Sequence, residues 1–214
     1  MNIVTGLRRS GTSMIMLMLK NAGLNIAGKK WAEFDKWQAE EANPNGYWET
    51  KESTKGLTEK IDGDVVKVMF DCLYKSNPEL IDKVLVIMRE PKSVLESLFK
   101  YNNIIEKKLF VLNHCLDVIE SLDYIQFFEK DYKIVFYEDI LNDPDNQTKE
   151  ICEFIGGDYK KALGTIDKKL NRCKGNDYHF IEYLESMYKL ARHGNISEIV
   201  RKREQIIKQV RKLI

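Results

Sequence analysis

A glycine-bracketed loop between an apolar run and a helical pattern constrains this chain more than any other feature. Asn2-Ile-Val-Thr5 is typical of a strand, and Gly6-Leu-Arg-Arg-Ser-Gly-Thr-Ser13 follows directly. Residues 13–22 are mostly apolar and precede Gly23, a residue type that commonly terminates helices. In this strand–loop–helix order, the backbone N–H groups of the loop and of the helix N-terminus converge and create an anion site.

The side chains of the loop suit the same anion. Ser10, Thr12 and Ser13 supply hydroxyl donors beside Gly11, and Arg9 supplies a permanently charged, planar group that matches phosphate or sulfate. The pattern resembles a Walker A loop, but Thr12 stands where the ATP-binding rule requires lysine. A turn that merely caps a buried helix is the alternative interpretation, and the order of the elements favours phosphate binding over it.

Strand and helix patterns alternate along the rest of the chain. Residues 64–69 and 83–88 are short, β-branched, nearly continuous apolar runs, which are typical of parallel strands covered on both faces, and 132–136 forms a fourth strand pattern. Helical patterns occur at 91–99, 104–128, 143–156, 178–192 and 197–213. The sequence therefore predicts a three-layer α/β/α, P-loop-like fold with a short parallel sheet. One domain is expected over 1–214, with a helical C-terminal part from about 176 to 214.

Composition narrows the classes of function. With 43% hydrophobic and 31% charged residues among 214, the chain resembles a packed globular protein. Its 34 basic and 33 acidic residues leave a formal charge of +1, so no global field favours nucleic acid or an anionic membrane. The longest apolar run, 14–19, is too short to span a bilayer. No secretion signal precedes the first strand, which predicts a cytoplasmic protein.

The cysteines are expected to be free thiols of a reducing compartment. They are widely separated, with no neighbouring histidine at the spacing of metal ligands, so no metal site is predicted. The four positions are Cys72, Cys115, Cys152 and Cys173.

Residues 25–63 differ from their surroundings, because aromatic and acidic side chains mix there and Asn43-Pro-Asn-Gly46 breaks them as a turn. We interpret this stretch as an excursion near the anion site. Its aromatic residues line an acceptor pocket in one interpretation and belong to the core in the other. They include Trp31, Trp37, Tyr47 and Trp48.

Three stretches together resemble the sulfotransferase family, whose sulfuryl donor is 3′-phosphoadenosine 5′-phosphosulfate (PAPS). The loop 6–13 is similar to the family's 5′-phosphosulfate loop, with Arg9 where members carry lysine or arginine before Ser-Gly. Arg8 departs from the family, since many members have proline there, and it is expected at the surface. Residues 133–144, followed by 151–156, are similar to a late strand–helix segment of the family. The resemblance covers roughly residues 1–160.

The second stretch, 84–97, is similar to the family's 3′-phosphate element, a strand that ends in arginine with a serine eight positions later. Arg89 and Ser97 match that pair. An arginine at the carboxyl end of a strand also faces the crevice in which open α/β sheets bind ligands, whatever the family. A surface ion pair of Arg89 with Glu90 and a neutral helical serine is the alternative.

Three residues are candidates for the chemistry. Arg9 is assigned to the leaving phosphate. Lys67 breaks an apolar strand and resembles a lysine that some members place near the transferring group, although a strand-end lysine that snorkels to water is an equal interpretation. Glu49 is the candidate general base, because related bacterial members show a similar Asn-Pro-x-Gly-Tyr-aromatic-Glu run. An apolar wall of Tyr47 and Trp48 would raise its pKa.

Other polar residues are interpreted as structural or solvent-exposed rather than catalytic. Glu49 is alternatively a loop cap, with Glu52 as reserve base. His114 is expected to be a packed histidine rather than a base. A degenerate basic-glycine element, Arg172-Cys-Lys-Gly175, is expected in a solvated loop, and the basic amphipathic pattern at 197–213 is expected to pack on the domain with its charges in water. Contact of that pattern with a membrane or a partner is the alternative.

His179 and His193, in the C-terminal helical part, are expected to be structural or exposed.

The resemblance implies a sulfotransferase that transfers a sulfuryl group from PAPS, without a metal, to a hydroxyl or amine of a small-molecule, carbohydrate or lipid acceptor. A P-loop kinase or nucleotide hydrolase is the first alternative, and it needs Mg²⁺, a lysine at position 12 and an acidic residue after an apolar strand. Asp71 alone offers the acidic residue. A nucleotide-binding protein without turnover is the second alternative. The sequence does not determine the acceptor or the oligomeric state.

Overall fold

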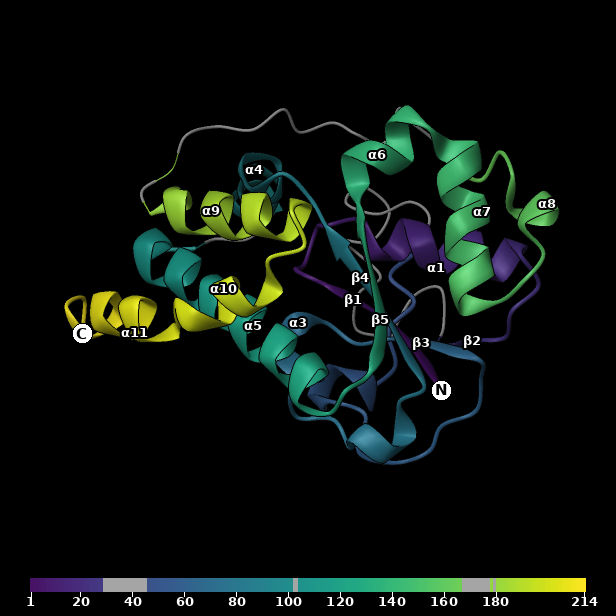
Figure 1. Cartoon of the computed structure of the whole chain (residues 1–214), viewed down its shortest axis with the longest axis horizontal. Helices are drawn as coiled ribbons and strands as arrows, with labels where there is room; N and C mark the ends of the chain where they lie inside the picture. Colours follow the sequence, from purple (N-terminus) through teal and green to yellow (C-terminus); the bar gives the residue numbers. More distant parts are fainter. Residues whose placement is uncertain (29–45, 102–103, 167–177, 179) are drawn as a thin grey trace.

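A parallel β-sheet forms the centre of the computed structural model, which describes residues 1–28, 46–101, 104–166, 178 and 180–214. The strand order is β2-β3-β1-β4-β5, and every neighbouring pair is parallel (Figure 1). The predicted parallel sheet is therefore confirmed. The strands are β1 Asn2–Gly6, β2 Ile26–Ala27, β3 Val65–Lys67, β4 Lys83–Met88 and β5 Asp131–Phe136.

Helices cover both faces of this sheet, as the three-layer prediction requires (Figure 1). One face carries α1 Thr12–Asn21, α6 Tyr137–Asn142, α7 Pro144–Ile155 and α8 Tyr159–Ala162. The opposite face carries α3 Phe70–Leu73, α4 Pro91–Tyr101, α5 Lys107–Phe127, α9 Ile181–Arg192, α10 Ile196–Arg201 and α11 Arg203–Arg211. Two short 3₁₀ helices, η1 Ser53–Lys55 and η2 Pro78–Leu80, lie in the connections.

The alternation of side chains along the strands divides the core into two clusters. In β1, Ile3 packs into one cluster and Val4 into the other, and in β4 Val84 and Leu85 do the same. All four side chains have no exposed surface. Because both faces of these strands are covered, nearly continuous apolar runs were the correct signal for them.

The order of the strands places the loop at the edge where ligands bind in such sheets. From β1 the chain passes through α1 to the β2–β3 side, and β4 then lies on the other side of β1. This reversal opens a crevice at the carboxyl ends of the strands. Gly6, Lys67 and Met88 end β1, β3 and β4 there.

Several elements differ from their predictions. The predicted helix at 197–213 is two helices, α10 and α11, because Lys202 has φ −75° and ψ −5°, and its N–H bonds the carbonyl of Ile199 in a tighter turn. Ile199 of α10 and Ile206 of α11 are both fully buried. Helix α6 was not predicted, since the expected helix began at Asp143, and β2 and α3 lie where no element was predicted.

The basic amphipathic pattern at the C-terminus packs on the domain, which was the first of the two interpretations of the sequence. Ile206 is fully buried against the cluster that contains α5. Arg203 donates to Asp123 at 2.6 Å and lies 3.0 Å from Glu120, both of which belong to α5. Within the described ranges, no helix is long and apolar enough to cross a membrane.

Candidate functional site

The loop between β1 and α1 requires both of its glycines. A Cβ on Gly6 would lie 2.4 Å from the carbonyl oxygen of Ile87, and a Cβ on Gly11 would lie 2.5 Å from Cδ2 of Tyr137. Gly11 also adopts φ +105°, which disfavours other residues. Close approach of the neighbouring backbone and ring is thus possible only with glycine at these two positions.

Three of the predicted site residues converge on this loop. Nε of Arg9 donates to Oγ of Ser97 at 2.8 Å, although the two residues are 88 positions apart. Nη1 of Arg89 donates to the carbonyl oxygen of Arg9 at 3.0 Å, and its guanidinium lies 4.4 Å from the ring centroid of Tyr137. The loop and the end of β4 therefore form one basic cluster, in which Arg89 contacts the loop directly.

The hydroxyls of the loop are buried beside this cluster. Ser10 is 1% exposed, and its Oγ has no hydrogen-bond partner within the described part of the chain. Thr12 is also buried, with its Oγ1 3.9 Å from Sδ of Met69. An unsatisfied buried hydroxyl is costly unless a partner binds it, and a phosphate oxygen is a suitable acceptor. The loop therefore fits the anion that the sequence predicted.

The two remaining catalytic candidates form a buried ion pair next to the loop. Nζ of Lys67 lies 3.0 Å from Oε1 of Glu49 and donates to Oγ of Ser13 at 3.2 Å. The Lys67 side chain is 2% exposed, which contradicts the interpretation that it snorkels to water. The same ammonium lies 5.7 Å from the ring centroid of Tyr47. The cation that pairs with Glu49 therefore also lies near the ring of Tyr47, whereas Trp48 is buried in the core cluster that contains α1.

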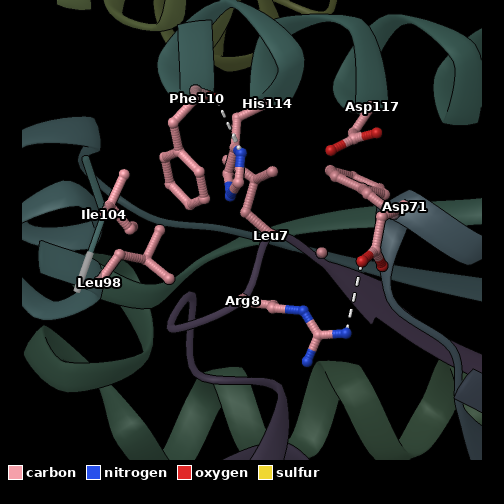
Figure 2. Close-up of a pocket in the computed structure, with 10 residues that line it drawn as sticks. Leu7, Arg8, Asp71, Leu98, Ile104, Phe110, His114 and Asp117 are labelled. Atoms are coloured by element: carbon pink, nitrogen blue, oxygen red, sulfur yellow. Dashed lines mark hydrogen bonds and ion pairs between the residues drawn. The ribbon is translucent and has the colours of Figure 1, made fainter. Parts of the chain in front are cut away.

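An open cavity of about 270 Å³ adjoins the loop, and no sequence pattern had indicated it (Figure 2). Arg8 lies at its edge, with Nη2 donating to Oδ2 of Asp71 at 3.3 Å. Burial alone would lower the pKa of Arg8, but the charges of Asp71 and Glu49 outweigh that effect and raise it. Arg8 is therefore within electrostatic reach of both the cavity and the buried ion pair. It is half-exposed, in keeping with the predicted surface position.

His114 lines the same cavity and is not charged near neutral pH. Burial lowers the pKa of His114 to about 4, and its Nδ1–H donates to the carbonyl oxygen of Phe110 at 3.1 Å. No spacing rule links this helical histidine to Arg8 or Asp71, which is why sequence reasoning assigned them no common site.

Some sequence predictions lie outside the described residues, and the contact of Glu52 within them is local. Glu52 precedes η1, where its carbonyl oxygen accepts from the N–H of Lys55 at 3.0 Å. Across the residues that the structure describes, no cluster of three or more His, Cys, Asp or Glu could hold a metal ion. The predictions outside the described residues concern Trp31, Trp37, residues 43–45, Arg172-Cys-Lys-Gly175 and His179.

Comparison with known proteins identifies a family. Residues 2–205 match the sulfotransferase domain family. Among solved structures, the sulfotransferase domain from the Synechococcus PCC 7002 olefin synthase is similar at 15% sequence identity and a TM-score of 0.41, with 85% of this chain and 82% of that chain covered. No curated protein matches significantly. The family match spans all of the site residues described above.

Proposed function

This chain belongs to the sulfotransferase domain family, and from that premise we propose that it transfers a sulfuryl group from PAPS to a hydroxyl or amine of an acceptor. One observation carries the proposal. Arg9 of the glycine loop hydrogen-bonds both Ser97 and Arg89, which the sequence analysis assigned to a separate phosphate element. Such a cluster suits a nucleotide with two phosphate groups, as in the donor's 3′- and 5′-phosphates.

Each half of the cluster has its own expected role toward the donor. The loop residues Ser10, Gly11 and Thr12, with the N-terminus of α1, would hold the 5′-phosphosulfate. Arg89 and Ser97 would hold the 3′-phosphate, and Arg9 would lie between the two groups. When bound, PAPS supplies the sulfuryl group and leaves as adenosine 3′,5′-bisphosphate (PAP).

The buried ion pair supplies the remaining chemistry. Transfer forms a bond from the acceptor oxygen or nitrogen to sulfur, breaks the bond from sulfur to the 5′-phosphate oxygen, and releases the acceptor proton. Glu49 would take that proton. Lys67, which holds Glu49 at 3.0 Å, would stabilise negative charge on the sulfonate during transfer. Arg9 would stabilise the charge on the leaving phosphate.

Calorimetric titration separates this function from a kinase or nucleotide hydrolase. We expect PAP to bind without a metal and to bind more tightly than ATP with Mg²⁺, because Thr12 replaces the lysine that ATP phosphates require. A preference for ATP with Mg²⁺ would instead support a kinase or nucleotide hydrolase. Formation of a sulfated product from a panel of hydroxyl and amine compounds then tests turnover.

Replacing Arg89 with alanine is expected to weaken PAP binding by more than about tenfold, since the change removes a charge-assisted contact. Arg9→Ala is expected to have an effect of the same size, because Arg9 positions Ser97 as well. Titration of the two variants with PAP measures the change in Kd. Arg201→Ala, at an exposed position of α10, is the control and should bind as the unaltered protein does. Unchanged affinity in both site variants would rule out the assigned phosphate site.

A further inference from the structure

The cavity beside the loop has an apolar end and an acidic end (Figure 2). Phe110, Leu98 and Ile104 lie together at one end, and Asp71 and Asp117 lie at the other. Phe70, His114 and residues 6–8 of the phosphate loop complete the lining. A molecule in this cavity would therefore lie directly against the loop proposed to bind the donor.

The acidic end has hydrogen-bonding capacity that the protein leaves unused. Oδ2 of Asp71 accepts from Arg8, whereas its Oδ1 is buried and has no hydrogen-bond partner in the described ranges. Asp117, half-buried on α5, faces the same space. Burial and then the charge of Asp71 raise the pKa of Asp117 to about 6. Both carboxylates would gain from a bound hydrogen-bond donor.

The charges that line the cavity do not balance. Asp71 and Asp117 carry two negative charges near neutral pH, Arg8 carries one positive charge, and His114 is neutral. Lys75 acts on Asp117 from outside the lining. The lining thus has one negative charge in excess, which a single cation would neutralise.

Resting on the function proposed above, we infer that this cavity binds the acceptor, and that the acceptor is a small hydroxyl compound with an apolar body and a protonated amine. The ammonium lies between the carboxylates of Asp71 and Asp117, and the apolar body contacts Phe110. The amine is not the reacting group, because a protonated nitrogen has no lone pair with which to attack sulfur. The hydroxyl is therefore sulfated.

The residues that line the cavity and its volume disfavour anionic, carbohydrate and large lipid acceptors. An anionic acceptor would meet the like charge of two aspartates. A carbohydrate needs many hydrogen-bond partners, but most of the lining is apolar. The volume of about 270 Å³ is slightly below the usual range for small-molecule sites, roughly 300–1,000 Å³, so a large lipid would not be enclosed.

Matched pairs of compounds test the charge preference. We would titrate the protein, saturated with PAP at neutral pH, with 4-(2-aminoethyl)phenol and its uncharged isostere 4-propylphenol, and with 5-aminopentanol and hexanol. Each amine is expected to bind at least about tenfold more tightly than its partner, as one charge-assisted contact provides. Equal or weaker binding of both amines, or no binding by any compound, would overturn the inference.

Two variants test whether Asp117 causes the preference for amines. Asp117→Asn keeps the shape of the side chain but removes its charge, and it should reduce the preference for amines to less than about threefold, with binding of the uncharged partners unchanged. Asp145→Asn, at an exposed position of α7, should keep the full preference. A preference that survives in Asp117→Asn would contradict the assignment.

The PAP titration distinguishes failure of this inference from failure of the proposed function. If PAP does not bind, the donor site is wrong and the acceptor proposal falls with it. If PAP binds and Arg89→Ala loses it, but the amines show no preference, only the inference about the acceptor is wrong.

Discussion

Exchanging Lys67 for methionine is expected to lower the free energy of unfolding by about 3–5 kcal/mol, because it leaves Glu49 charged and without its ammonium partner in a buried site. The same exchange is expected to lower the rate of sulfuryl transfer by at least about 100-fold, since it removes the cation that we propose to stabilise the transferring group. Chemical denaturation measures the first effect, and product formation at saturating PAPS measures the second.

A double-variant cycle separates the structural role of Lys67 from its catalytic role. Lys67→Met with Glu49→Gln removes both charges, so most of the lost stability should return. Activity should not return, because neither the cation nor the base is restored. Recovered activity in the double variant would mean that Lys67 acts only by stabilising the fold.

The Glu49→Gln variant alone tests the remaining alternative, a nucleotide-binding protein without turnover. In a sulfotransferase, this change should lower the rate by about 100-fold or more, the usual contribution of a general base, while PAP affinity changes little. If sulfated product is formed at an unchanged rate, Glu49 is not the base. If no protein, altered or unaltered, forms product from any acceptor, the chain binds nucleotide without turnover.

The parts of the site that local sequence determines were predictable. The loop 6–13 carries its own signal, because glycine spacing, a preceding strand and a following helix are all contiguous. Arg89 was predicted from its resemblance to the family's 3′-phosphate element and from its place at the end of a parallel strand, which faces the ligand crevice. The predicted strand 83–88 coincides with β4, whose two faces are both covered and whose residues are therefore all apolar except Lys83.

The parts that depend on tertiary contact were not predictable in the same way. The ion pair of Lys67 with Glu49 joins a strand to a segment 18 positions away that has no periodic pattern, so the sequence left the position of the lysine open. The cavity needs Arg8, Asp71 and Asp117 from three separate elements. The short helices α3, α6 and α8 were not predicted, because one or two turns give too little apolar periodicity to detect.

The contacts of Tyr137 join the two phosphate elements into one unit. Its ring lies against Gly11 on the loop and beneath the guanidinium of Arg89 at the end of β4. Tyr137 is 5% exposed, so the ring has no solvent-filled space into which it could move. Any side chain at position 11 would therefore displace the ring, and through it Arg89, which binds the carbonyl oxygen of Arg9.

Gly11→Ala is accordingly expected to weaken PAP binding by at least about 100-fold, the loss of two charge-assisted contacts. Its Cβ would lie 2.5 Å from Cδ2 and 3.0 Å from Cε2 of Tyr137. Gly23→Ala is a matched control, because Gly23 has φ +93° against +105° at Gly11 but has no atom within 4 Å of the added Cβ. Both variants should lose roughly 1–2 kcal/mol of stability from the left-handed backbone.

Titration with PAP and thermal unfolding of the two variants together show whether a loss of PAP binding comes from backbone strain or from altered geometry of the site. Gly23→Ala should bind PAP within about twofold of the unaltered protein, because its strain lies at the far end of α1. If Gly11→Ala also binds normally at equal loss of stability, then Tyr137 does not couple the loop to Arg89. If both variants lose binding equally, the loss comes from general destabilisation, and the close approach of loop and ring is not what shapes the donor site.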